Sequence, residues 1–158
     1  MRTDDALVDA LLVTSRALVG VAARSLADAK DVTLPQFRAL VVLASHPRLT
    51  VTELAAALDI HASTATRMCD RLVAKRLVLR QARPGDRRIV ELRLAAGGRK
   101  LVDRVTERRR EAIRSIVFRL PPGVSEAVIE ALDAFGRAAG EVLGDDPFGW
   151  QLASATQA

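Results

Sequence analysis

The helical spacing of apolar residues is interrupted at one place along this 158-residue chain, and that interruption constrains the fold more than any other feature. Between Leu77 and Leu94, two β-favouring runs flank the turn-forming stretch Arg83-Pro84-Gly85-Asp86, which predicts a β-hairpin with strands over 77–79 and 89–94 and a long basic tip. On both sides of it, apolar residues recur three and four positions apart, the spacing of one helix face. The chain is therefore expected to be mainly α, with one small β element.

Four helices are expected before the hairpin and two after it. Their expected ranges are about 4–28, 34–45, 51–58 and 62–75, then a long helix that follows Gly97-Gly98 and ends near Leu120, and a last one over 128–142. Thr33 can cap the second helix, and Thr50 with Glu53 forms a capping box for the third. Aromatic residues make up only 3% of the chain, so the core is expected to be aliphatic.

The positive charge is concentrated in one segment. The formal net charge is +5, yet the stretch from Arg67 to Arg93 alone holds nine basic and three acidic residues. A basic stretch of this kind favours a polyanionic partner such as nucleic acid. On its own it is also typical of a solvated surface, and Arg76, Arg80 and Arg93 fit that interpretation equally well.

The third and fourth helices are separated by only Asp59, Ile60 and His61, the short turn of a helix-turn-helix. On the helix after this turn, one face is apolar and should pack inward: Ala65, Met68, Cys69, Leu72 and Val73. The opposite face carries polar side chains, whose hydroxyls and arginines suit contacts to base edges and phosphates: Ser63, Thr64, Thr66, Arg67, Asp70 and Arg71. His61 is either a phosphate contact or simply the start of the helix.

The hairpin adds a second basic element beside that helix. Arg83, Arg87 and Arg88 surround its turn, and a basic hairpin next to a groove-reading helix is expected to reach the flanking minor groove. These residues complete a predicted winged helix-turn-helix.

The stretch from Leu34 to Val102 resembles the winged helix-turn-helix of the MarR family of bacterial and archaeal regulators. The matching motifs are "TVTELAAAL", "STATRMCDRLVAKRLV" and "PGDRRIVELRL". The resemblance implies a dimer that binds a palindrome, with groove-reading positions at Ser63, Thr64, Thr66 and Arg67, and a wing pair in which Asp86 orients Arg88. One departure is Ala95-Ala96, where the family usually has a threonine that caps the long helix.

The expected organisation follows from these elements. Residues 33–95 form the DNA-binding winged helix-turn-helix, residues 1–30 and 97–144 form dimerisation helices, and residues 145–158 form a flexible tail. The expected function is a sequence-specific transcriptional regulator, a repressor, that binds a palindromic operator as a homodimer and is released by a small anionic or aromatic effector. The alternative is a winged-helix dimer that binds a ligand or acts as a scaffold through protein partners rather than DNA.

Several other classes are not favoured. The sequence lacks a glycine-rich phosphate loop, metal-ligand spacing and a histidine placed beside a nucleophile, so we expect no enzyme, no metal and no cofactor. Polar residues interrupt every apolar run, so we expect a cytoplasmic protein with no membrane segment. Cys69 is interpreted as a packed core residue rather than a redox switch, and Arg16 as either a salt-bridge partner or an anchor for an anionic effector. Asp103, Glu107 and Glu111 are expected to form exposed ion pairs with the neighbouring arginines Arg104, Arg108, Arg109 and Arg110.

Overall fold

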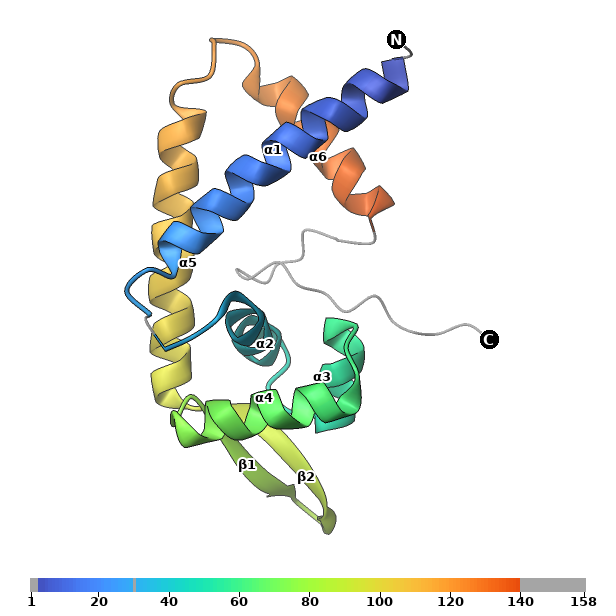
Figure 1. Cartoon of the computed structure of the whole chain (residues 1–158), viewed down its shortest axis with the longest axis vertical. Helices are drawn as coiled ribbons and strands as arrows, with labels where there is room; N and C mark the ends of the chain where they lie inside the picture. Colours follow the sequence, from blue (N-terminus) through green and yellow to red (C-terminus); the bar gives the residue numbers. More distant parts are fainter. Residues whose placement is uncertain (1–2, 30, 140–158) are drawn as a thin grey trace.

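The computed structural model describes residues 3–29 and 31–139, which form six helices and one antiparallel hairpin (Figure 1). The elements are α1 (Thr3–Ser25), α2 (Leu34–Ser45), α3 (Val51–Leu58), α4 (Ala62–Ala74), β1 (Val78–Arg83), β2 (Asp86–Leu94), α5 (Ala96–Val117) and α6 (Ser125–Ala138). The mainly α, winged helix-turn-helix fold predicted from the sequence is confirmed. The predicted tail over 145–158 and the end of the predicted last helix lie outside the described residues.

α5 spans the molecule and is shared by two regions (Figure 1). α2, α3, α4 and the hairpin gather around the start of α5, whereas α1 and α6 lie toward its far end. The hydrophobic core belongs to the first region, and apart from Cys69 its fully buried side chains are aliphatic, as expected. The largest are Leu40, Leu43, Leu54, Leu72, Leu92, Val42, Val78, Val102 and Val105.

The helix starts follow the sequence signals. Thr33 caps α2, and Gln36 completes a capping box there by accepting from the Thr33 N–H at 3.2 Å. Thr50 and Glu53 form the predicted box at α3, with Glu53 Oε2 accepting from Thr50 N at 2.7 Å. α5 begins after Ala95 with no side-chain cap bond, as the departure at this position predicted.

The hairpin is longer than predicted, and its turn is tighter. The sequence predicted a first strand over 77–79 only, but β1 continues to Arg83 and pairs there with Asp86, leaving Pro84 and Gly85 as the two turn residues. Pro84 fixes its own φ, and Gly85 adopts φ +90, a region that favours glycine. The polar residues that suggested a loop are accommodated because the outer part of the ribbon is open to water on both faces: the consecutive residues 79–82 of β1 are all exposed.

The pair Gly97-Gly98 is also placed differently from the prediction. It does not precede the long helix but lies in the first turn of α5, which begins at Ala96. Gly98 is buried, and its Cα lies against the main chain at Leu77. The glycine pair is therefore a packing feature of the helix rather than a linker.

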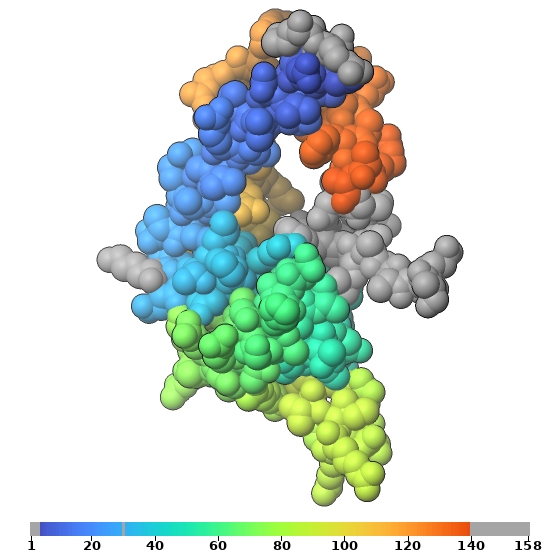
Figure 2. Space-filling model, turned by 45° about the vertical axis from the view of Figure 1, so that its right-hand side comes forward, coloured from blue at the N-terminus to red at the C-terminus, as the bar shows by residue number. Residues whose placement is uncertain are grey.

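The second region leaves much apolar surface uncovered. α1 exposes Leu7, Val8, Leu12, Val13, Leu18 and Val19, and α6 has no buried residue over its whole length. By length and composition alone the segment Asp4–Ser25 is long and apolar enough to cross a membrane, even though polar residues interrupt it. Figure 2 shows open space between part of α1 and α6.

Candidate nucleic-acid interface

The turn between α3 and α4 is set by local backbone chemistry. Asp59 ends α3 in the left-handed region at φ 53, which an aspartate tolerates better than most residues because its short side chain can bond locally. The Ile60 N–H then bonds to the Ala55 carbonyl at 3.0 Å. His61 occupies the N-cap of α4 without a side-chain cap bond, so the structure supports its role as the helix start.

α4 has the two faces that its sequence predicted. Ala65, Cys69 and Leu72 are buried, and Met68 and Val73 are half-buried against the core. All predicted outward residues of this helix are exposed: Ser63, Thr64, Thr66, Arg67, Asp70 and Arg71. Thr66 Oγ1 donates to the Ala62 carbonyl at 2.9 Å, so its remaining capacity is that of an acceptor.

The hairpin lies beside α4 and projects away from the helices (Figures 1 and 2). The pairing shifts next to the turn, because Ala82 pairs with Val90 while Arg83 pairs with Asp86. Arg87, Arg88 and Ile89 therefore have no partner residue on β1, and the two arginines are exposed.

Asp86 contacts Arg88 in a different way from the one the resemblance implied. Its Oδ1 accepts from the Arg88 main-chain N–H at 3.0 Å, rather than from the guanidinium. The carboxylate thus holds the backbone of the tip, and in this geometry it orients the Arg88 side chain only through that backbone.

The basic residues of the Arg67–Arg93 segment divide into two groups. Four of them pair with another side chain of the protein: Lys75 with Gln36, Arg80 with Asp70, Arg83 with Glu91, and Arg93 with Gln81. Five have no side-chain hydrogen bond or ion pair to any residue that the structure describes: Arg67, Arg71, Arg76, Arg87 and Arg88. Four of these five were predicted contact residues, and they supply unneutralised charge along α4 and at the hairpin tip.

Arg83 was also predicted as a contact residue, but its guanidinium points to a carboxylate that the sequence analysis passed over. Arg83 Nε donates to Glu91 Oε1 at 2.5 Å, and this bond, with nearby carboxylates, raises the pKa of Arg83. Glu91 is buried although it lies in a strand of alternating character. The only signal in the sequence was an acidic residue within the strand part of a mainly basic hairpin.

Cys69 is fully buried on the inward face of α4. Burial raises the pKa of its thiol, so the reactive thiolate is disfavoured. The structural interpretation of this cysteine is therefore supported. Over residues 3–29 and 31–139, no group of three or more histidine, cysteine, aspartate or glutamate side chains could hold a metal ion.

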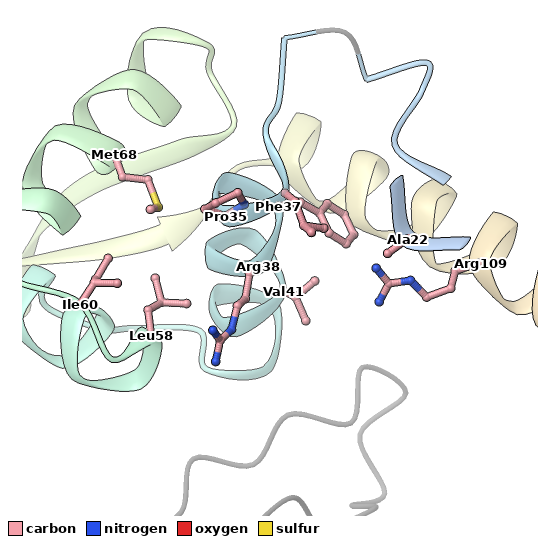
Figure 3. Close-up of a pocket in the computed structure, with 10 residues that line it drawn as sticks. Ala22, Pro35, Phe37, Arg38, Val41, Leu58, Ile60, Met68 and Arg109 are labelled. Atoms are coloured by element: carbon pink, nitrogen blue, oxygen red, sulfur yellow. The ribbon is translucent and has the colours of Figure 1, made fainter. Parts of the chain in front are cut away.

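A cavity of about 440 Å3 lies between α2, the end of α3, α4 and α5 (Figure 3). Its walls are mostly apolar and include Phe37, Val41, Leu58 and Met68, and two arginines, Arg38 and Arg109, also line it. Arg109 was predicted to form an ion pair on an exposed face, which is wrong. It is half-buried, its Nε finds no hydrogen-bond partner among the described residues, and burial lowers its pKa.

The comparisons with known proteins agree with this geometry. The MarR family model matches residues 30–89. The uncharacterised HTH-type transcriptional regulator YsmB of Bacillus subtilis is 30% identical over 100 residues, which are 63% of this chain and 68% of YsmB.

Two solved structures cover most of the chain. RV1404 from Mycobacterium tuberculosis is 39% identical, with a TM-score of 0.80 over 89% of this chain and 96% of that one. A mutant of S. aureus MepR bound to an oligodeoxyribonucleotide has 24% identity and a TM-score of 0.64 over 88% of this chain and 99% of that one, a likeness of fold. The chain therefore belongs to the MarR family of transcriptional regulators, and α3, α4 and the β1–β2 hairpin form its DNA-binding winged helix-turn-helix.

Proposed function

We propose that this protein is a repressor that binds a palindromic operator as a homodimer, with α4 in the major groove and the hairpin at the flanking minor groove. The observation that carries the proposal is the position of the uncompensated cations. Arg67 and Arg71 on α4 and Arg87 and Arg88 at the hairpin tip are exposed on two elements that lie side by side. A helix about 10–12 Å wide fits the major groove, which is about 12 Å wide.

The first two turns of α4 are the proposed sequence readers. The hydroxyls of Ser63 and Thr64 can donate or accept, Thr66 accepts, and Arg67 can present two parallel donors to a guanine. Arg71 lies one turn further along α4 and is proposed to contact phosphate. Removing a bidentate contact to a base costs about 1–3 kcal/mol of discrimination.

The hairpin tip is proposed to clamp the DNA rather than read it. Arg87 and Arg88 carry their charge away from the protein body, and a narrow minor groove attracts arginine through its negative potential. Asp86 contributes by holding the Arg88 backbone. MepR, which shares the fold, has been solved with an oligodeoxyribonucleotide, and this supports DNA as the partner.

A second copy of this chain is the proposed occupant of the exposed apolar faces of α1 and α6. Phe118, just after α5, is 91% exposed, and Leu12 and Phe135 are more than half exposed. Large apolar side chains exposed on neighbouring helices are typical of an interface in a soluble protein. A two-fold dimer would also give the operator its palindromic form.

The test is selection of bound sequences from a random duplex library, followed by affinity measurements on the selected operator. Arg67→Ala should lower the preference for the operator over single-base variants, whereas Arg88→Ala should weaken binding to all of them by a similar factor. Arg114→Ala removes an exposed charge from the far part of α5 and should change neither quantity. Selection of no palindrome, or full binding by both variants, would overturn the proposal.

We further propose that a small molecule with an apolar body and an anionic group releases the DNA by occupying the cavity of Figure 3. The lining offers apolar side chains for the body, and Arg109 offers a donor that has no partner within the described chain. Met68 of α4 and Ile60 of the preceding turn also line the cavity, so an occupant would touch the reading helix itself. Release requires tighter binding to the DNA-free arrangement.

Benzoate and benzamide test this part, because they have nearly the same shape and differ in charge. Benzoate at millimolar concentration should raise the melting temperature of the protein and lower its operator affinity. Benzamide should have smaller effects on both. In Arg109→Gln the two compounds should have equal effects. Equal effects of the two compounds, or no loss in Arg109→Gln, would contradict an anion site at Arg109.

A further inference from the structure

The hairpin contains one buried carboxylate in a ribbon that is mostly exposed and basic. The side chain of Glu91 is only 7% exposed, whereas its neighbour Arg93 and its cross-strand partner Gln81 are exposed. A buried carboxylate is costly unless it is paired and hydrogen-bonded. The contacts of Glu91 therefore have to explain why it is there.

Each carboxylate oxygen of Glu91 faces a different arginine. Oε1 accepts from Arg83 Nε at 2.5 Å, and Oε2 lies 4.0 Å from a terminal guanidinium nitrogen of Arg48. Arg83 belongs to β1 and Glu91 to β2, so the first contact crosses the hairpin. Arg48 belongs to the link between α2 and α3, so the second contact leaves the hairpin altogether.

The backbone reinforces this second connection. Leu49, next to Arg48, exchanges two main-chain hydrogen bonds with Leu92: Leu92 N to Leu49 O at 2.7 Å, and Leu49 N to Leu92 O at 3.4 Å. Glu91 and Leu92 together thus tie the hairpin to the segment that leads into the helix-turn-helix. No other residue described in the hairpin has ion pairs to both β1 and that link.

The charge around Arg83 is already balanced within the protein. Besides its bond to Glu91, the guanidinium feels the carboxylates of Glu53 and Asp86. A DNA phosphate would have to compete with these groups for the same cation. Arg87 and Arg88, by contrast, meet no such competition from the described residues for their side chains.

From this arrangement we propose that Glu91 is a positioning residue of the hairpin, and that Arg83 is its strut rather than a DNA contact. Together with Arg48 they fix the angle at which the tip presents Arg87 and Arg88 to the minor groove. The inference rests on the proposed DNA binding. It also differs from the sequence-based assignment of Arg83, which placed this residue among the contacts.

The test is a double-mutant cycle with Glu91→Gln, Arg83→Gln and the combined variant. Glu107 and Arg110 form an exposed ion pair on α5 at 3.4 Å, so Glu107→Gln, Arg110→Gln and their double variant are a matched control with the same charge changes. Operator affinity is measured well below each melting temperature, as a function of salt and with long or truncated flanking sequence. Hydrogen exchange of the hairpin amides is measured without DNA.

The proposal predicts that Glu91→Gln and Arg83→Gln each weaken binding to the long operator about tenfold, which corresponds to about 1.4 kcal/mol. The double variant should be little worse than either one, because the two side chains act as a unit. The salt slope should not change, since no phosphate contact is lost. Truncated operators, which lack the flanks that the tip reaches, should bind all three variants like the parent, and the control cycle should show no effect.

Two results would overturn it. If Arg83→Gln lowers the salt slope by about one and its effect multiplies with that of Glu91→Gln, then Arg83 contacts phosphate directly. If the variants bind like the parent, the strut has no positioning role. Should the parent itself bind no duplex, the proposed function fails. In that case hydrogen exchange tests the strut separately. If Glu91→Gln leaves the exchange of the amides over 83–91 unchanged, the strut proposal fails as well.

Discussion

Gly98 illustrates how a single residue can decide the junction between two elements. A Cβ built at this position would lie 2.2 Å from the Leu77 carbonyl oxygen and 2.7 Å from Leu94 Cδ1. One of these atoms is main chain and cannot move aside by changing a rotamer. The start of α5 can approach the base of the hairpin only because no side chain stands between them, a feature that helical spacing in the sequence cannot reveal.

Gly98→Ala is therefore expected to lower the free energy of unfolding by about 1–3 kcal/mol, the usual cost of forcing an extra carbon into a packed site. Gly97→Ala is the matched control, because its Cβ would come no closer than 3.4 Å to the Arg76 carbonyl oxygen. That change should be neutral or slightly stabilising, since alanine favours the helix. Urea unfolding of both variants measures the difference, and equal stabilities would refute the close-approach argument.

The helices differ in how well their first turns are capped. α2 and α3 begin with complete capping boxes, whereas α5 has Ala95 at its N-cap and no side-chain cap bond. α5 is also the element that joins the DNA-binding region to the proposed dimer region. Its start is thus a place where stability can be added without touching any proposed DNA contact.

Ala95→Ser should raise the free energy of unfolding by about 1 kcal/mol, because a serine oxygen can accept from an N–H group of the first turn. Thr50→Ala should have the opposite effect of similar size by removing a cap that exists. Thermal unfolding of the two variants checks both signs. A destabilised Ala95→Ser would mean that the site, where Ala95 is buried, has no room for the hydroxyl.

The capping box of α3 also predicts a pH dependence. The Thr50 main-chain N–H and hydroxyl donate to Glu53 and hold the pKa of Glu53 below its ordinary value of 4.5. A lowered pKa in the folded state means that the ionised form stabilises the fold above the ordinary pKa, and that this stability is lost as the pH falls through the lowered value. The stability difference between the parent and Glu53→Gln should therefore shrink from pH 7 toward pH 3. A difference that stayed constant in denaturant titrations would contradict it.

At the scale of the whole molecule, one half is packed and the other is not. The core lies around α2, and the far region presents exposed leucine, valine and phenylalanine side chains on α1 and α6. This contrast is what a subunit that shares its second core with another copy should show. It also explains why α1 has the length and apolar character of a membrane span.

Leu12→Glu should shift the protein from dimer to monomer and reduce operator affinity together with it, because a buried carboxylate without a partner is costly. Leu79→Glu is the control for association, because it makes the same change at an exposed leucine of β1, away from α1 and α6. Sedimentation velocity over a range of concentrations measures the association. A dimer unaffected by Leu12→Glu would place the interface elsewhere.

The sequence predicted most of the DNA-binding region, because the signals there are local. The caps at Thr33 and Thr50, the three-residue turn at Asp59 and the two faces of α4 all follow from neighbouring residues. The pairing of Glu91 with Arg83 and Arg48, the close approach at Gly98 and the burial of Arg109 depend on segments far apart in the chain. The spacing of residues along the chain does not indicate which distant side chain a residue will contact, so these features could be found only in the structure.

Hydroxyl-radical footprinting on the selected operator tests the central claim most directly, since it reports minor-groove protection at single-nucleotide resolution. The account predicts a symmetric footprint with two half-sites about 10 base pairs apart or a multiple of that spacing. The minor grooves that flank the half-sites should be protected. In complexes with Arg88→Ala this flank protection should be lost, whereas in complexes with Arg67→Ala it should remain. An asymmetric footprint, or flanks that stay protected in Arg88→Ala, would contradict DNA reading by α4 and clamping by the hairpin tip.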